Sequence, residues 1–349
     1  MTAFSDTRGG HYGDSPQAGK PAGGGELAES ARLLLRHQRE HWPMLSSGFQ
    51  SLDSIREREI EFDGFRMKLQ FNPGRIVSAS AKVDKKSIRE RKCFLCRNNL
   101  PPEQKGLLYR DYMILGNPFP IFNEHFTITH VNHIPQLIGG AFESLLDITK
   151  TMAPSYTLLY NGPQCGASAP DHLHFQAGER GAMPVDSNWR TLIDGHGKWV
   201  VDEDRFRAAR VDDGLRRYVI MDTDDKLLLM RQFAKLIAGF KAVSLQSGIT
   251  GAEEDEPMIN ILSSFENNRW RIIIFLRRRH RPARYFLEGM DQILFSPASA
   301  DFGGICILPV ERDFEKLTAE ELTEMFEEVS ATPEMLDTVV NDLQDSKDF

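Results

Sequence analysis

The sequence predicts an α+β protein in which antiparallel strands pack against helices and two degenerate repeats follow one another. Residues 172–178 alternate apolar and polar side chains, as a half-buried strand does. The segment from 136 to about 152 is apolar at helical spacing, and it is followed by a short strand at 156–161. After residue 199 a strand, an amphipathic helix and a hairpin recur in a similar order.

The composition is that of a globular protein and excludes several classes of function. The chain has 349 residues, of which 41% are hydrophobic, and a net charge of −8. We find no run of about 18 apolar residues and no apolar core of a secretory signal near the N-terminus, so we expect a cytoplasmic protein without a membrane partner. The negative charge argues against general nucleic-acid binding. Four cysteines are too few for a disulfide scaffold of this size.

We divide the chain into a disordered tail, a first half and a second half, at residues 1–24, 25–198 and 199–349. The tail is rich in Gly, Ser, Asp and Pro and has no periodicity. Leucines at helical spacing predict a helix over 26–45, and alternation around the turn at Asn72, Pro73 and Gly74 predicts two strands over 65–83.

The second half repeats this plan and ends in helices. Residues 216–222 are expected to form a strand, 224–240 a helix, and 258–280 a hairpin that turns at 266–268. Thr318 is expected to cap a C-terminal helix, with Glu321 three residues later. If the halves are repeats, we place Trp270, Ile272 and Ile274 where the first half carries its alternating polar residues, so that the second copy kept the fold and lost the chemistry.

Polar residues with a period of two mark the candidate site. His172, His174 and Gln176 alternate with Leu173 and Phe175, which places the polar side chains on one face of the strand. The preceding loop contains small residues that let backbone N–H groups approach a phosphate, namely Gly166, Ala167 and Ser168.

A Cys-x-x-Cys motif stands at Cys93 and Cys96. On its own, such a motif is compatible with metal binding, redox chemistry or core packing. The surrounding "KCFLCRNN" does not offer the helix N-terminus after a parallel strand that a thioredoxin-like redox site uses.

The "HLHFQ" strand resembles the active-site strand of the histidine-triad (HIT-like) superfamily. With glutamine in its last polar position, the strand resembles that of the transferase branch of the superfamily. This branch contains galactose-1-phosphate uridylyltransferase, diadenosine tetraphosphate phosphorylase and the GDP-hexose phosphorylases. Residues 117–137 resemble the other signature of the superfamily, with His125 and His133 at either end of a strand. The Asn-Pro turn and basic residues before Cys93 resemble the start of the uridylyltransferase. Asp171 departs from the pattern, because it adds a residue between Pro170 and the first histidine of the strand.

The resemblance implies a nucleotidyltransferase that moves a nucleoside monophosphate through a covalent intermediate on His174. The donor would be a nucleotide sugar or a dinucleoside polyphosphate, and the acceptor a phosphate or a sugar phosphate. Gln176 and Ser168 would bind the transferred phosphoryl group, and Gly166 and Ala167 would bind substrate. The alternatives are a hydrolase of the same superfamily and a non-catalytic nucleotide-binding protein.

The resemblance also supplies two further metal ligands. It adds His133 and His172 to Cys93 and Cys96, which implies a closed, structural Cys₂His₂ zinc site. Iron at the site, or no metal, are the alternatives.

The segment "RRRHRPAR" at 277–284 is a dense basic cluster in an acidic chain. Arginine binds phosphate in a bidentate manner, which makes Arg277 and Arg279 candidate substrate-binding residues. The alternative is a solvated turn that pairs with acidic helices.

Overall fold

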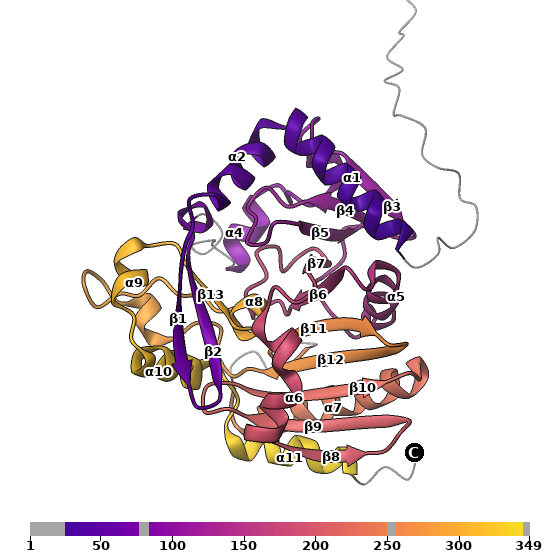
Figure 1. The fold of residues 1–349 in the computed structure, drawn as a ribbon, viewed down its shortest axis with the longest axis vertical. Helices are drawn as coiled ribbons and strands as arrows, with labels where there is room; N and C mark the ends of the chain where they lie inside the picture. The colour runs from indigo at the N-terminus through magenta and orange to yellow at the C-terminus, as the bar shows by residue number, and fades with distance from the viewer. Residues whose placement is uncertain (1–24, 77–83, 250–255, 345–349) are drawn as a thin grey trace, which may run out of the picture.

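A ten-stranded sheet forms the centre of the computed structural model, which describes residues 25–76, 84–249 and 256–344. The strand order is β3-β4-β5-β7-β6-β11-β12-β10-β9-β8, and a three-stranded sheet has the order β1-β2-β13. Figure 1 shows the strands of the large sheet one beside the next from one end of the molecule to the other. The strands are β1 (Arg56–Phe62), β2 (Phe65–Phe71), β3 (Gly106–Tyr109), β4 (Tyr112–Gly116), β5 (His125–His130), β6 (Tyr156–Asn161), β7 (His174–Glu179), β8 (Gly197–Asp202), β9 (Phe206–Asp212), β10 (Arg217–Thr223), β11 (Ile259–Glu266), β12 (Arg269–Leu276) and β13 (Ile305–Leu308).

Helices cover both faces of this sheet. Within the described ranges, no helix is long and apolar enough to cross a membrane. The α-helices are α1 (Glu26–His41), α2 (Pro43–Leu52), α4 (Lys85–Glu90), α5 (Phe142–Met152), α6 (Pro184–His196), α7 (Lys226–Gln246), α8 (Ser299–Phe302), α9 (Glu311–Lys316), α10 (Ala319–Val329) and α11 (Pro333–Gln344), and the 3₁₀ turns are η1 (Pro73–Arg75), η2 (Arg97–Asn99) and η3 (Ala283–Phe286).

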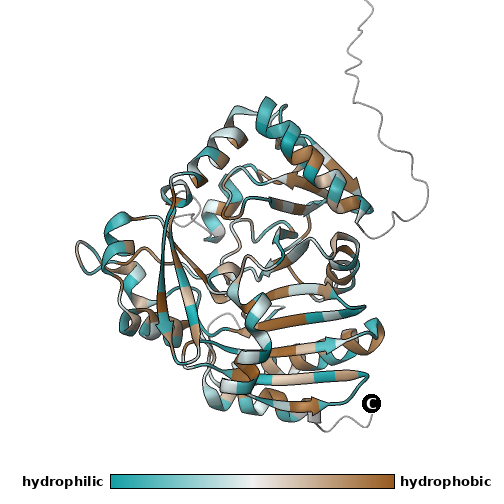
Figure 2. Ribbon diagram, in the orientation of Figure 1, coloured by the Kyte–Doolittle hydropathy of each residue, from teal (hydrophilic) through white to brown (hydrophobic). Residues whose placement is uncertain are grey.

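Two hydrophobic cores lie on opposite faces of the large sheet. One contains apolar residues of α1, α5, α7 and α11 together with Phe175 and Ala177 of β7. The other contains residues of α6, α10 and the small sheet together with Leu159 of β6 and Ile273 of β12. Figure 2 shows hydrophobic stretches along several strands of the large sheet, and many hydrophilic residues on the helices α1 and α2. Burial on both faces makes this α+β sheet the rigid support of the molecule.

The order of elements is the same on both sides of the sheet centre. Strands β3, β4, β5, then α5, β6 and β7 are followed by β8, β9, β10, then α7, β11 and β12, and β6 pairs with β11 in the middle. A common origin of the two halves, and the domain division at residue 198, stay predictions. The small sheet joins the halves, because β2 pairs with β13. The predicted disordered tail, residues 1–24, lies outside the described residues.

The predicted equivalence of Trp270, Ile272 and Ile274 with the polar residues of β7 is wrong by one residue. These three side chains lie in the same core as Phe175 and Ala177. Successive strand residues point to opposite faces. Arg271 and Ile273 therefore share the face of His174 and Gln176, and a slip of one position in the alignment inverted the faces.

Two local predictions need correction, and one is confirmed. The helix expected over 26–45 ends at His41, and a second helix begins at Pro43, where the ring favours the first helical position. Strand β2 pairs with β1, which the sequence did not predict, and the remainder of its expected hairpin partner, residues 77–83, lies outside the described residues. The capping box is confirmed, because Thr318 Oγ1 accepts from the Glu321 N–H at 3.2 Å.

Candidate active site and metal centre

A cavity of about 710 Å³ opens at the polar end of β7. His174 and Gln176 of β7 line it, as do Thr127 of β5 and Leu159 of β6, which are the register partners of Gln176. Other parts of the wall come from the loop before β7, from segments on both sides of Cys93, from residues 115–121 and from residues between 280 and 307. A cavity of this size accommodates a nucleotide-sized ligand.

His174 has the geometry of a neutral nucleophile. Its Nδ1 lies 2.8 Å from the backbone carbonyl of His172, an acceptor, so Nδ1 carries the proton and donates it there. Burial lowers the pKa of His174 to about 4, which leaves the imidazole uncharged near neutral pH. The lone pair therefore resides on Nε2, and the side chain lines the cavity.

Gln176 is held by a second histidine on the neighbouring strand. The backbone N–H of Ile121 donates to Nδ1 of His125 at 3.2 Å, so the proton of His125 resides on Nε2. This N–H donates to Oε1 of Gln176 at 2.8 Å. Burial, and then the charge of Arg75, lower the pKa of His125 to about 3, which keeps this pair neutral. The Gln176 amide thus has its oxygen occupied and its NH₂ available to a ligand.

The loop of small residues bends toward the cavity at Gly166. This residue has φ 94°, a conformation that glycine adopts without strain, and a Cβ there would lie 2.6 Å from Cβ of Ala298. Gly166, Ala167 and Ser168 all line the cavity, and their contact with a ligand stays a prediction. Substitution of Gly166 would displace the loop from Ala298.

The structure does not bring Arg277 and Arg279 to the cavity wall. Arg277 is fully buried, and its guanidinium donates to Asn260 Oδ1 and to the carbonyls of Pro297, Arg279, His280 and Val329. Arg279 is exposed and pairs with Glu328 at 3.7 Å, as the alternative reading of the basic cluster expects for a turn beside an acidic helix. His280 and Arg281 line the cavity instead.

A network of amides explains the position of Arg277. Asn260 donates through Nδ2 to Asn161 Oδ1 at 2.8 Å and to the carbonyl of Cys165 at 2.7 Å. Asn161 Oδ1 also accepts from the Ser299 N–H at 2.8 Å. Arg277 therefore stabilises the base of the 166–168 loop from beneath, where it contacts protein rather than ligand.

The four predicted metal ligands lie together. One ligand atom from each of Cys93, Cys96, His133 and His172 lies within 4.8 Å of every other. The Sγ atoms approach the Nδ1 atoms at 3.3 Å for Cys93 and His172, and at 3.2 Å for Cys96 and His133. The edges of a zinc tetrahedron measure about 3.3–3.8 Å for bonds of about 2.0–2.3 Å, so these two distances lie close to the lower end of that range. The cluster is thus able to hold a metal ion.

The surroundings of His172 favour the same role. Its Nε2–H donates to the backbone carbonyl of His130 at 2.8 Å, which leaves Nδ1 free for a metal. His172 precedes the first residue of β7, so its side chain departs from the alternation and turns toward the cysteines rather than along the row of His174 and Gln176. A metal here would fix the start of the strand that carries His174.

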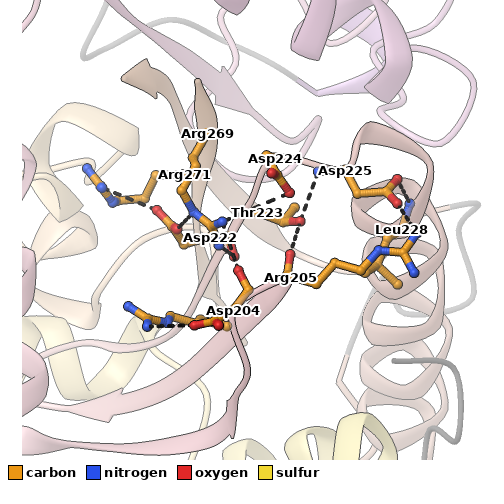
Figure 3. Close-up of polar contacts among 10 residues, drawn as sticks. Asp204, Arg205, Asp222, Thr223, Asp224, Asp225, Leu228, Arg269 and Arg271 are labelled. Atoms are coloured by element: carbon orange, nitrogen blue, oxygen red, sulfur yellow. Dashed lines mark hydrogen bonds and ion pairs between the residues drawn. The ribbon is translucent and has the colours of Figure 1, made fainter. Parts of the chain in front are cut away.

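The matching face of the second half carries ion pairs. Arg271 and Arg269 of β12 both donate to the buried carboxylate of Asp222 on β10, as Figure 3 shows. Beside them Asp225 caps α7, where its Oδ1 accepts from the Leu228 N–H at 2.9 Å. Arg271 also lies 3.8 Å from the ring centroid of Trp189 on α6. The charged side chains of Arg269, Arg271 and Asp222 on this face are therefore paired with one another.

The overall architecture matches structures of a known enzyme. Yeast Ap4A phosphorylase Apa2 in complex with AMP superimposes with a TM-score of 0.50 at 14% identity, over 82% of this chain and 95% of that chain. The complex of the same enzyme with Ap4A superimposes with a TM-score of 0.50 at 14% identity, over 84% of this chain and 97% of that chain. This chain has the fold of an Ap4A phosphorylase. The fold expected from the resemblance to the histidine-triad transferases is thereby confirmed.

A family model also matches part of the sequence. A model described as a domain of unknown function, DUF4922, matches residues 34–179, which include the metal cluster and β7. A DUF4931 family protein from Bacillus cereus aligns at 15% identity over 52% of this chain and 88% of that chain, with a TM-score of 0.34, which is too low to establish a common fold. No curated protein sequence matches significantly.

Several site residues escaped the sequence analysis. His125 carried a signal, since it opens the first signature, but its pairing with Gln176 depends on the register of β5 and β7. Arg281 stood within the basic cluster without a reason to prefer it. Arg91 and Asp301 also line the cavity, and no sequence motif marks either of them.

Proposed function

We propose that the chain is a nucleotidyltransferase of the phosphorylase kind, acting through a covalent nucleotidyl intermediate on His174. The observation that carries the proposal is the hydrogen bond from Nδ1 of His174 to the carbonyl of His172 in a cavity-lining, neutral imidazole. A histidine with one nitrogen donating to a fixed acceptor presents the other as a nucleophile.

The reaction consists of two displacements at phosphorus. In the first, Nε2 of His174 attacks the α-phosphorus of the donor, an N–P bond forms and the P–O bond to the leaving phosphate breaks, with its electrons on that oxygen. In the second, an oxygen of the acceptor phosphate attacks the same phosphorus and the N–P bond breaks, which restores His174. Nucleophilic catalysis divides one difficult transfer into two easier ones.

Gln176 and the 166–168 loop stabilise the charge on the phosphoryl group. The Gln176 amide donates through its NH₂ because His125 occupies its oxygen. A preorganised donor at this position costs no reorganisation during the reaction. An amide cannot give up a proton, so the leaving oxygen departs as part of an ionised phosphate. Phosphate leaving groups and acceptors suit such a site, which favours transfer to phosphate over hydrolysis.

The neighbours with the same fold support a nucleotide donor. The yeast phosphorylase was solved with AMP and with Ap4A. We infer a dinucleoside polyphosphate or a nucleotide sugar as donor for this chain, and phosphate or a sugar phosphate as acceptor. Zinc held by Cys93, Cys96, His133 and His172 would contribute structure, since four protein ligands leave no open position for water.

A labelling experiment tests the proposal. Ap4A carrying ³²P in its α-phosphates, and α-³²P-labelled GDP- and UDP-sugars, are incubated with the protein without acceptor and the product is denatured. We expect acid-labile, alkali-stable label on the wild-type chain from at least one donor and none on His174→Ala. Addition of phosphate should release the label as a nucleoside diphosphate. Release as monophosphate indicates a hydrolase, and the absence of label from all donors contradicts the proposal.

A further inference from the structure

Asp171, the residue inserted before the active-site strand, joins the metal cluster to the cavity. Its Oδ1 accepts from Nη2 of Arg91 at 2.7 Å, and its Oδ2 lies 3.6 Å from Nε2 of His133. His133 belongs to the metal cluster, whereas Arg91 lines the cavity. One carboxylate thus contacts a ligand of the cluster on one side and a cavity arginine on the other.

Arg91 is held in place from several directions. Beyond the bond to Asp171, its Nη2 lies 3.5 Å from the carbonyl of Ser168 in the loop that lines the cavity. Its Cζ lies 5.1 Å from the ring centroid of Phe94, which also lines the cavity. A guanidinium fixed by a carboxylate, a carbonyl and an aromatic ring loses little further conformational entropy when it binds a ligand.

One donor group of this guanidinium has no partner among the residues that the structure describes. Nη1 of Arg91 is buried and makes no hydrogen bond to any of them. A buried donor of a charged group that stays unpaired is costly, and an anionic oxygen is its natural acceptor. The neighbouring Nη2 of the same guanidinium lies 3.5 Å from the Ser168 carbonyl, so the group stands beside the loop that we assign to the transferred phosphate.

We propose that Arg91 binds a phosphate group of the nucleotide in this cavity and that Asp171 is its positioning residue. The inference rests on the proposed function and deepens it, since it names the side chain that holds the phosphate. Asp171 restricts Arg91 to the rotamer that faces the cavity and ties that rotamer to the metal cluster through His133. The insertion that departs from the family pattern thus acquires a role in ligand binding.

Binding measurements on the purified full chain test the proposal. ADP, GDP and UDP are titrated calorimetrically beside adenosine, guanosine and uridine, and the diphosphate that wild type binds best is used for the variants. Arg91→Gln should weaken the binding of that diphosphate about tenfold or more, because a charged hydrogen-bond donor is lost. The affinity for the corresponding nucleoside should stay unchanged. Arg91→Lys, which keeps the charge without the planar fork, should give an intermediate loss. Lys92→Gln, the same charge change at an exposed neighbour outside the cavity, should bind as wild type does.

The role of Asp171 is tested by non-additivity. Asp171→Asn should weaken the binding of the diphosphate less than Arg91→Gln does. In an Arg91→Gln background it should have no further effect on this affinity, because Asp171 acts through Arg91. Metal content and melting temperature, measured on every variant, confirm that the cluster and fold are intact. Wild-type affinity in Arg91→Gln overturns the inference, and if wild type still becomes labelled on His174 the proposed function stands. A wild type that binds none of the diphosphates overturns the inference as well, and absence of the label then rejects the proposed function separately.

Discussion

Nε2 of His125 donates to Oε1 of Gln176 at 2.8 Å, and this bond sets which end of the Gln176 amide a ligand meets. The N–H of Ile121 occupies Nδ1 of the same ring, so the alternative tautomer would place two donors against each other. Because the low pKa of His125 keeps the ring neutral, the arrangement persists across the pH range of most assays. In the proposed reaction we therefore expect His125 to act on the phosphoryl group through Gln176.

His125→Phe should lower kcat about tenfold to a hundredfold with a smaller change in KM, because a misplaced catalytic donor costs rate rather than ground-state binding. His125→Gln, whose amide can donate to Gln176 and accept from Ile121, should recover part of the loss. Steady-state kinetics of both variants with the best donor measures this.

The control for His125 is the double variant with Gln176→Ala. If His125 acts through Gln176, His125→Phe should have little effect on kcat once Gln176 is absent. Additive losses would contradict the positioning role. Melting temperatures distinguish the loss of positioning from a loss of stability, since leaving the Ile121 N–H unpaired costs about 1–3 kcal/mol of unfolding free energy.

The metal cluster should contribute to stability as well as to geometry. We expect about one zinc per chain in the purified protein, and Cys93→Ser should lose the metal and lower the melting temperature together, since binding energy of a structural metal adds to folding energy. Cys165→Ala removes a buried thiol outside the cluster and should keep the metal. Elemental analysis and thermal unfolding measure both. A wild-type protein that contains no metal, and whose melting temperature Cys93→Ser leaves unchanged, would argue against a structural ion.

The sequence predicted the parts of the site that follow from local pattern. Alternation identified the strand of His174 and Gln176, and the Cys-x-x-Cys motif together with the resemblance supplied four ligands that the fold brings within 4.8 Å of one another. Strand β1 was missed because its charged, exposed residues give no apolar face to recognise, as Arg56, Glu57 and Glu59 illustrate.

The remaining site residues depend on long-range pairing. The His125–Gln176 bond requires the antiparallel register that sets Thr127 opposite Gln176, which no local window contains. Arg277 was expected at a ligand because arginine binds phosphate in a bidentate manner, whereas carbonyl acceptors from three segments make its burial in the protein possible. Composition shows that a basic cluster exists, but only the tertiary structure decides which of its members face a cavity.

Glu256 should make stability depend on pH. It is buried beneath the turn at Gly162 and accepts from the Ile138 N–H at 2.5 Å and from Tyr160 Oη at 2.7 Å. Burial raises its pKa from 4.5 to about 7. The native state therefore holds a proton that the unfolded chain releases, so the unfolding free energy should fall as pH rises from about 4.5 to 7.

Glu256→Gln should remove this decrease of the unfolding free energy with pH. At pH 8 the variant should therefore be more stable than wild type, by on the order of 3 kcal/mol at most. Denaturant unfolding of wild type and variant at pH 5, 6, 7 and 8 measures it. Glu288→Gln makes the same charge change at an exposed residue and should retain the wild-type slope. Parallel pH profiles for wild type and Glu256→Gln would show that Glu256 does not titrate in this range.

Gln176 should decide between transfer and hydrolysis. In Gln176→His, a new imidazolium can give the leaving oxygen of the first displacement a proton, which the amide cannot, and the neutral ring that remains can accept a proton from an attacking water in the second. We expect label still to form on His174, and the ratio of released monophosphate to transferred nucleotide to rise about tenfold or more, as general acid–base catalysis allows. Gln176→Ala, which lacks donor and acid alike, should slow labelling and leave the ratio near the wild-type value. If the ratio in Gln176→His also stays at the wild-type value while the intermediate forms, acceptor binding sets the outcome, and Arg91 and Arg281 on the cavity wall become the residues to substitute next.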